Sequence, residues 1–477
     1  MPPASIVTRV TRSVRWAFLE SLLSALASLV TVLVLARLVP PDEFGRAGIA
    51  VAISLIVQAA LLGGMPDALV RSPSAHTRLT DSAFWSLLVI GVASVLVIAG
   101  CGLIVARWDP RLGALIAVQG LTTIAVAAAA VPTGLLLRKM RTRALAKRTA
   151  VSKLAGLAAS IGFALAGTGA WAVVLGNLAA QAVGTLQLLA SMRAPAWRLR
   201  DPQLATLLRI GVMSGAQQSL GTLSTRGFVL AFGAVFGAYQ VGLFNFALRL
   251  VEESCGLVIT TLRRVTVTSF AAAKRSALDM KPMFIAGTNV IAYGTAPLFL
   301  GGAAVAPDAV ALLFGPQWAG AVPALQLMLG LWVVRATRIL VNAVMVVEGR
   351  QRAMVGFGAI GLAATAAAFA AAAPFGPAWT TFAYAATIVG VIFGGPAFTR
   401  QTGISLSTQL TAGLAPIGFA VAMAAVVVAL RVGPLAAMPL ALRLAIEIGA
   451  GLSVFVGLAL AFDRASLARL QRLALRR

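Results

Sequence analysis

The chain has 477 residues, of which 60% are hydrophobic and only 11% are charged, and its mean hydropathy is +0.93. Soluble domains are nearer half apolar and a quarter charged, so this composition excludes a soluble globular protein. The formal net charge is +25. In a membrane protein such an excess of Lys and Arg is first explained by loops that set the topology, and no nucleic-acid partner is predicted.

Apolar runs of the length that a membrane-spanning helix needs, about 20 residues, recur along almost the whole chain. The protein is therefore expected to be an all-α integral membrane protein. Fourteen spans are predicted, at about 16–38, 45–65, 83–105, 113–137, 151–168, 171–191, 205–236, 239–262, 284–305, 320–347, 353–373, 378–398, 409–430 and 436–462.

The loops between these spans alternate in charge. Of the 39 Lys and Arg residues, 29 lie on one predicted side and six on the other. Because positive loops stay in the cytoplasm, both termini are predicted to be cytoplasmic. Arg9, Arg12 and Arg15, ahead of the first span, fit either an interfacial amphipathic helix or a simple positive flank.

The segment LARLVPPDEFGRAGIA, residues 35–50, predicts a polar turn between the first two spans, with Asp42 or Glu43 near the start of the second helix, where the helix dipole favours an acid. A weak copy, FGAVFGAYQVGLFNFA, follows at residue 232 with an offset of 197, so that Gly45 matches Gly242. The two copies occupy equivalent places in the order of spans: one follows the first span and the other follows the seventh. The chain therefore contains an internal repeat.

Each repeat unit holds six spans, an even number, so both units begin on the same face and are predicted to be parallel. The expected architecture is two parallel six-helix lobes plus two C-terminal helices. Residues 1–200 form the N-terminal lobe, 201–402 the C-terminal lobe, and 403–477 the last two spans with a basic cytoplasmic tail.

Four arginines fall near the middle of predicted spans: Arg226 in the seventh, Arg249 in the eighth, and Arg335 and Arg338 in the tenth. An arginine that faces lipid at this depth costs about 2.5–3.5 kcal/mol. Four would cost roughly 10–14 kcal/mol, comparable to the whole stability of an ordinary protein. These side chains are therefore expected to face protein or a water-filled cavity, and all four belong to the second lobe.

Polar residues share helix faces with these arginines. The predicted substrate-binding set is Arg226, Arg249, Arg335, Arg338, Asn342 and Gln218. The predicted ion-coupling acids are Glu20, Glu252 and Glu253, and Glu447 is the remaining acid within a span.

Some of these assignments leave an alternative open. Arg249 either belongs to the site or forms a helix-locking ion pair with Glu252 or Glu253. The stripes of small and polar residues in spans 1 and 7 line either a hydrated cleft or a close-packing face. No acid lies three or four residues from Arg335 or Arg338 on their own helix, so an anion or a partner helix has to balance their charge.

Several kinds of chemistry are not predicted. The chain lacks the G-x-x-x-x-G-K-[ST] loop that cradles nucleotide phosphates. Its single His76 lies in a predicted loop, and Cys101 and Cys255 lie in separate spans. No catalytic residue, cofactor, disulfide or metal site is therefore expected, and the protein is not predicted to be an enzyme.

The run A-R-L-V-P-P-D-E-F-G, then Gly63-Gly64, D-S-A-F-W at residue 81 and G-L-F-N-F-A-L-R-L at residues 242–250 resemble the Wzx-type polysaccharide flippases. These belong to the polysaccharide transporter family of the multidrug/oligosaccharidyl-lipid/polysaccharide exporter superfamily. The resemblance implies a V-shaped exporter fold in the bacterial inner membrane. It implies alternating access with cationic residues in the cavity, although the first lobe of this chain has no mid-span arginine.

The resemblance further implies a cargo, an undecaprenyl-diphosphate-linked oligosaccharide repeat unit that moves from the cytoplasmic to the periplasmic leaflet for surface polysaccharide biosynthesis. Membrane lipids are implied partners, with a polysaccharide polymerase and chain-length machinery as further candidates. A drug or cation exporter and a lipid II flippase of the same superfamily are the alternatives within this class. A membrane-bound polysaccharide polymerase or acyltransferase and a non-transporting scaffold are the alternatives from other classes.

Overall fold

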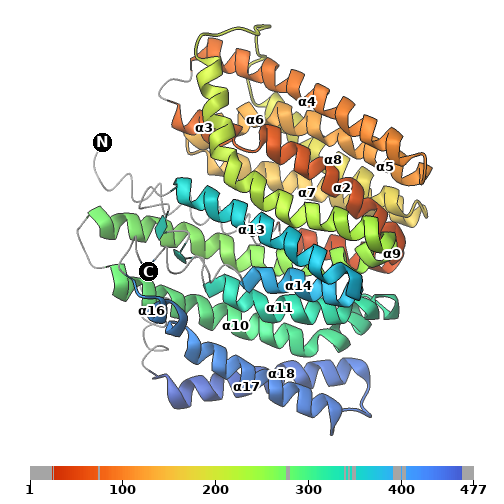
Figure 1. Ribbon diagram of the computed structural model, residues 1–477, viewed down its shortest axis with the longest axis vertical. Helices are drawn as coiled ribbons and strands as arrows, with labels where there is room; N and C mark the ends of the chain where they lie inside the picture. The colour runs from red at the N-terminus through yellow and green to blue at the C-terminus, as the bar shows by residue number, and fades with distance from the viewer. Residues whose placement is uncertain are drawn as a thin grey trace. The chain divides into compact units, whose positions relative to one another are not determined.

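A computed structural model describes residues 24, 26–72, 76–275, 280–337, 340–341, 344–345, 351–389, 399 and 404–464 (Figure 1). Within these ranges the chain is built of helices and short turns, and no strand is present. The chain divides by internal contacts into two compact units, Met1–Asn245 and Phe246–Arg477. The predicted division into lobes at residues 200 and 402 stays a prediction.

The first unit begins, in the described residues, with a short apolar helix, Leu26–Leu38. The helices that follow are α2 (Pro41–Leu62), α3 (Met65–Arg71), α4 (Thr77–Val105), α5 (Pro110–Gly120), α6 (Thr122–Arg138), α7 (Thr142–Leu165), α8 (Ala170–Ala190) and the first part of α9 (Leu204–Arg275). Helices α7 and α8 pack side by side, and α6 contacts α3, α4 and α8.

Local sequence explains where several of these helices begin. Helices α2 and α5 have proline at their first position, where the missing N–H loses no hydrogen bond. Asp109 caps α5 by accepting from the N–H of Leu112 at 3.0 Å. His76, predicted to lie in a loop, caps α4, because its Nδ1 accepts from the N–H of Leu79 at 3.0 Å.

The second unit contains the rest of α9 and the elements α10 (Met280–Leu313), η1 (Pro316–Ala321), α11 (Val322–Thr337), α13 (Gln351–Ala372), η2 (Ala373–Phe375), α14 (Pro377–Val389), α16 (Leu406–Thr411), α17 (Leu414–Val432) and α18 (Leu440–Phe462). Helix α10 contacts α11, α17 and α18, and α17 and α18 form a pair. The fully buried indole of Trp318 stacks on Phe246 with ring centroids 4.2 Å apart.

Ten helices of the described residues are long and apolar enough to cross a membrane. Each of the fourteen predicted spans overlaps helix in the described residues, but turns interrupt or shorten several of them, for example at residues 63–64, 121, 412–413 and 436–439. Helix α7, which holds the predicted span 151–168, is not among the ten. Predicted spans 7 and 8 lie in one long element, α9, which consists of two helices that meet at Gly237. Gly237 has φ 81° and ψ 174°, a backbone conformation that glycine adopts readily and that residues with a Cβ atom disfavour. The predicted joint between 236 and 239 therefore falls on this glycine.

Candidate functional site

The predicted polar stripe of α9 lies beside a close-packing stripe. Gly211, Gly215 and Ser219 face α2 and α3: a side chain at Gly211 would overlap Met65, and Ser219 Oγ donates to the carbonyl of Ala59 at 2.7 Å. On the neighbouring face, Gln218 is exposed and Arg226 is half-buried. The small residues of α9 therefore form a close-packing face, and the hydrated cleft stays a prediction for the neighbouring polar residues.

Three predicted residues follow Gly237 in α9. Arg249, Glu252 and Glu253 are all half-buried and lie in the second unit. Their spacing of three to four residues puts them within one turn of each other. The choice between a substrate contact and a helix-locking ion pair for Arg249 stays a prediction.

Arg335 is exposed on α11, near the end of a helix whose composition fits a membrane span. Its guanidinium carbon lies 4.4 Å from the centroid of the Trp332 ring, a cation–π arrangement that fixes the side chain without neutralising its charge. Arg338 and Asn342, the predicted companions of Arg335, lie outside the described residues, as does Glu20. The structure therefore places part of the predicted set on helices and does not bring the whole set together.

A lysine of the first unit, not singled out in the sequence, contacts the first apolar helix. Lys153 lies in α7, which starts nine residues before the predicted span 151–168, and its Nζ donates to Ser28 Oγ at 2.8 Å. Ser28, one of the polar residues of predicted span 1, is buried, so this part of that span faces α7. A mostly apolar cavity of about 230 Å³ adjoins the pair, lined by Leu26, Ala27, Val30, Ala150, Lys153, Leu154 and Leu157.

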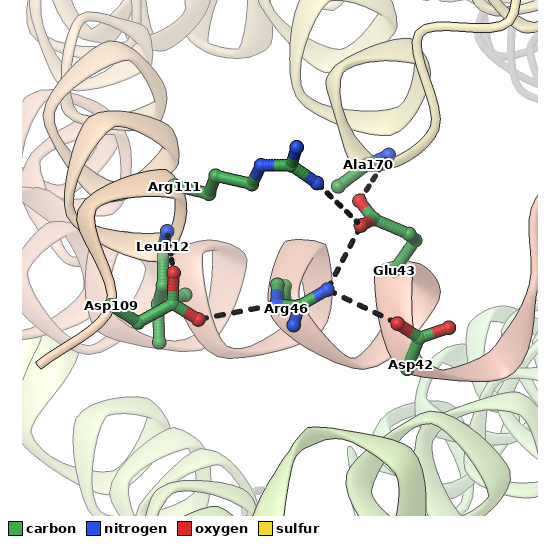
Figure 2. A network of polar contacts seen from close by, with 7 residues as sticks. All are labelled: Asp42, Glu43, Arg46, Asp109, Arg111, Leu112 and Ala170. Atoms are coloured by element: carbon green, nitrogen blue, oxygen red, sulfur yellow. Dashed lines mark hydrogen bonds and ion pairs between the residues drawn. The ribbon is translucent and has the colours of Figure 1, made fainter.

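The PPDEFGR turn carries a network of charges, here called the Arg46 network: Asp42, Glu43, Arg46, Asp109 and Arg111 (Figure 2). Arg46 reaches Asp42 at 3.1 Å, Glu43 at 2.8 Å and Asp109 at 3.1 Å. Because these acids belong to the first turn of α2 and to the cap of α5, one guanidinium joins two helix starts.

A third helix start joins the same network. Glu43 Oε2 accepts from the N–H of Ala170, the first residue of α8, at 3.1 Å, and Arg111 approaches the other oxygen at 3.9 Å (Figure 2). Carboxylates at helix N-termini are stabilised by the unpaired N–H groups and by the helix dipole. The network therefore fastens α2, α5 and α8 at one end of the first unit.

Asp109 shows how this fastening acts on a titratable group. Burial is the largest influence and raises the pKa of Asp109. The hydrogen bond from the N–H of Leu112 and the guanidinium of Arg46 each lower this pKa, and together they exceed the effect of burial. The pKa of Asp109 therefore lies below its ordinary value of 3.8. Both interactions stabilise the charged form, so Asp109 is held as a carboxylate.

The two copies of the internal repeat contact each other within the first unit. A side chain at Gly45 would overlap the carbonyl of Ala238, and one at Gly242 would overlap the carbonyl of Pro41. With the offset of 197, Gly45 matches Gly242 and Pro41 matches Ala238. Such reciprocal contacts are those of two segments related by a two-fold axis.

A third contact of the repeat follows the same rule. A side chain at Gly48 would overlap the amide of Asn245, and the same offset matches these two positions. Glycine is needed in this contact because it lets two helix backbones approach closely. The weak sequence repeat thus corresponds to a physical contact between its copies.

Comparisons with known proteins place this geometry in a class. A family model described as polysaccharide biosynthesis protein matches residues 34–323. The succinoglycan biosynthesis transport protein ExoT of Rhizobium meliloti (strain 1021) is 26% identical over 333 residues, which are 69% of this chain and 67% of that protein. The lipopolysaccharide biosynthesis protein WzxC of Escherichia coli (strain K12) is 22% identical over 349 residues, 70% and 69% of the two chains.

Solved structures show the same fold. The lipid II flippase MurJ in an inward closed conformation matches with a TM-score of 0.71 at 11% identity, over 95% of this chain and 99% of that one. An inward-facing multidrug resistance MATE family transporter matches with a TM-score of 0.62 at 15% identity, over 81% and 96%. At these identities the likeness shows the fold alone. It confirms the predicted all-α exporter fold, and the curated relatives confirm the predicted resemblance.

Proposed function

Because the chain belongs to the polysaccharide biosynthesis protein family, we propose that it moves undecaprenyl-diphosphate-linked oligosaccharide repeat units from the cytoplasmic to the periplasmic leaflet of the bacterial inner membrane. The family match over residues 34–323 is the observation that carries this proposal. The exporter fold supports it, since that fold serves alternating access. Both termini are proposed to be cytoplasmic, with the polysaccharide polymerase and chain-length machinery as partners.

The chemistry of the cargo agrees with the charges on the helices. A diphosphate with a sugar chain is anionic and strongly hydrated, so a bare bilayer blocks it. Arginine binds phosphate oxygens in bidentate fashion. Arg335, exposed on an apolar helix beside Trp332, is proposed to hold the diphosphate or an acidic sugar together with Arg338. Arg226, Arg249, Asn342 and Gln218 are proposed to complete the cationic and polar lining of the cavity.

The movement of the cargo needs a driving force, and the acids Glu20, Glu252 and Glu253 are proposed to couple it to an ion. Glu252 and Glu253 lie within one turn of Arg249 on α9 and are half-buried.

The test is deletion of the gene in its host, followed by analysis of lipid-linked intermediates. Repeat units that accumulate on the cytoplasmic leaflet, with loss of surface glycan, are the expected result. Unchanged surface glycan without accumulation would overturn the proposal.

Complementation of the deletion strain then assigns the residues. The double substitution Arg335→Ala and Arg338→Ala is expected to lower surface glycan by about tenfold or more, since hydrogen bonds between charged groups contribute about 1.5–3 kcal/mol each. Arg111→Ala is the matched control, because its side chain is 80% exposed in the Arg46 network. Full complementation by the double variant, at normal protein level in the membrane, would contradict the assignment.

A further inference from the structure

A buried acid in the second unit has no role in the proposed cargo path. Glu447 lies in α18, where that helix packs against α10 and α17. Its residue surface is 0% exposed, and neither carboxylate oxygen accepts a hydrogen bond from an N–H or hydroxyl donor of the described residues. Its hydrogen-bonding neighbour is another carboxyl group, that of Asp308. A buried carboxyl group without a donor is an unfavourable place for a charge.

The charged groups around Glu447 come from all three helices and form what we name the Glu447 cluster: Asp308 of α10, Arg431 of α17, and Arg443 and Glu447 of α18. The predicted span ends at residue 305, but α10 continues to Leu313. Asp308 therefore lies in this helix, where it is buried. Lys281, at the other end of α10, is about 40 Å away along the helix at 1.5 Å per residue.

The two arginines of the cluster are engaged elsewhere. Arg443 holds Asp308 through both of its carboxylate oxygens, with Nη2 to Oδ1 at 2.6 Å and Nε to Oδ2. Arg431 donates Nη1 to the carbonyl of Ala304 at 2.8 Å. The charge of Asp308 is therefore balanced by Arg443. Arg431 instead donates to a neutral carbonyl group, that of Ala304, one turn before Asp308 in α10.

The charges of this cluster balance differently with and without a proton on Glu447. With a proton on Glu447, the carboxyl is neutral, and Arg431 stays on Ala304 as observed. Without the proton, the two arginines and two acids balance in charge, and Arg431 can leave Ala304 to pair with Glu447. We propose that Glu447 is a proton-binding site, which releases its proton to water as Arg431 moves from the Ala304 carbonyl to the Glu447 carboxylate.

A proton is favoured over a metal ion by the composition of the cluster. Only two acids meet here, and one of them is occupied by Arg443. In the part of the chain that the structure describes, no group of three or more His, Cys, Asp or Glu side chains could hold a metal. The proton can reach the cluster from the side of Arg443, whose side chain is 20% exposed. The use of this proton to drive transport rests on the proposed function; the site itself does not.

Infrared spectroscopy of the full-length protein in lipid nanodiscs tests the site directly. The wild type should show the C=O stretch of a buried protonated carboxyl group, and Glu447→Gln should lose it. Glu43→Gln is the matched control, because Glu43 is held as a carboxylate by Arg46 and Ala170 and its replacement should leave the band unchanged. An identical band in the wild type and Glu447→Gln would overturn the proposal.

A second variant tests the exchange of partners and does not depend on folding of the first. Arg431→Gln removes the group that would balance the deprotonated acid, so the carboxyl band should persist at an alkaline pH where the wild-type band has disappeared. Disappearance of both bands at the same pH would exclude Arg431 as the alternative partner.

Proteoliposomes then separate the proton site from transport. Flipping of lipid-linked oligosaccharide by the wild type should respond to an imposed proton gradient, and Glu447→Gln should flip at a rate that the gradient does not change. A wild type that flips without any response would reduce Glu447 to a structural proton site. A wild type that does not flip at all would refute the proposed function, and the infrared band would still decide the proton site.

Discussion

The Arg46 network and the Glu447 cluster use the same residue types in opposite ways. In the Arg46 network the charges are partly exposed, and one arginine shares three acids, two of which, Glu43 and Asp109, also accept from backbone N–H groups at helix starts. In the Glu447 cluster one acid is fully buried and lacks a donor, while a nearby arginine contacts a carbonyl. Complete pairing at a partly wet helix end fastens helices together. Incomplete pairing in a dry interior leaves a group that can exchange a proton.

Removing the paired acid from the buried cluster should have the largest effect. Asp308→Asn leaves the mostly buried guanidinium of Arg443 without a carboxylate, and breaking a buried pair in this way costs about 3–5 kcal/mol of stability. Thermal unfolding in detergent measures the loss. An apolar double variant, Asp308→Leu with Arg443→Met, should recover most of it. A single variant as stable as the wild type would contradict the picture of a dry cluster.

Removing the central cation of the exposed network should have a smaller effect. Arg46→Ala leaves three acids that repel each other, but its side chain is 25% exposed and water screens them. We expect a loss of about 1–3 kcal/mol. Crosslinking between the starts of α2 and α5 should also become less efficient. A loss as large as that of Asp308→Asn would erase the distinction between the two regions.

The pH dependence of stability sharpens the comparison. The pKa of Asp109 is lowered in the folded protein, so its contribution is complete above the ordinary pKa and is lost as the pH falls below about 4. The Arg46 network should therefore stay intact between pH 7 and pH 5 and weaken in stronger acid. Asp109→Asn should flatten the acid side of the stability profile, and an unchanged acid side would show that Asp109 does not contribute.

The smallest effect is expected at the rim of the same network. Arg111 is 80% exposed and approaches Glu43 at 3.9 Å. Isolated exposed pairs of this kind contribute at most about 1 kcal/mol and many contribute nothing measurable. Arg111→Ala should therefore change the free energy of unfolding by less than about 0.5 kcal/mol. A larger loss would show that the network is held from its rim.

The parts of the fold that depend on local hydropathy could be predicted from the sequence. Each predicted span overlaps helix in the described residues, and the joint at Gly237 falls within the predicted gap, because apolar length and glycine act locally. The acids at the start of α2 followed from helix chemistry in the same way. The repeat offset gained a physical basis once Gly45 and Gly242 were found in contact.

Contacts between distant segments could not be predicted in this way. Asp109, the cap of α5 and a partner of Arg46, lies 63 residues further along the chain, and the partner of Lys153, Ser28, lies 125 residues before it. Glu447 was recognised as an acid within a span, but its neighbour Asp308 lay beyond the predicted end of another. No single sequence carries the pairing of such residues, since it depends on how whole helices pack.

The most direct test of the central claim is flipping by the purified protein in liposomes that contain undecaprenyl-diphosphate-linked oligosaccharide, measured with a membrane-impermeant glycosidase. The account predicts that glycan in the inner leaflet becomes accessible faster with the wild type than with the Arg335→Ala and Arg338→Ala variant or with no protein. Equal rates for wild-type and protein-free liposomes would contradict it.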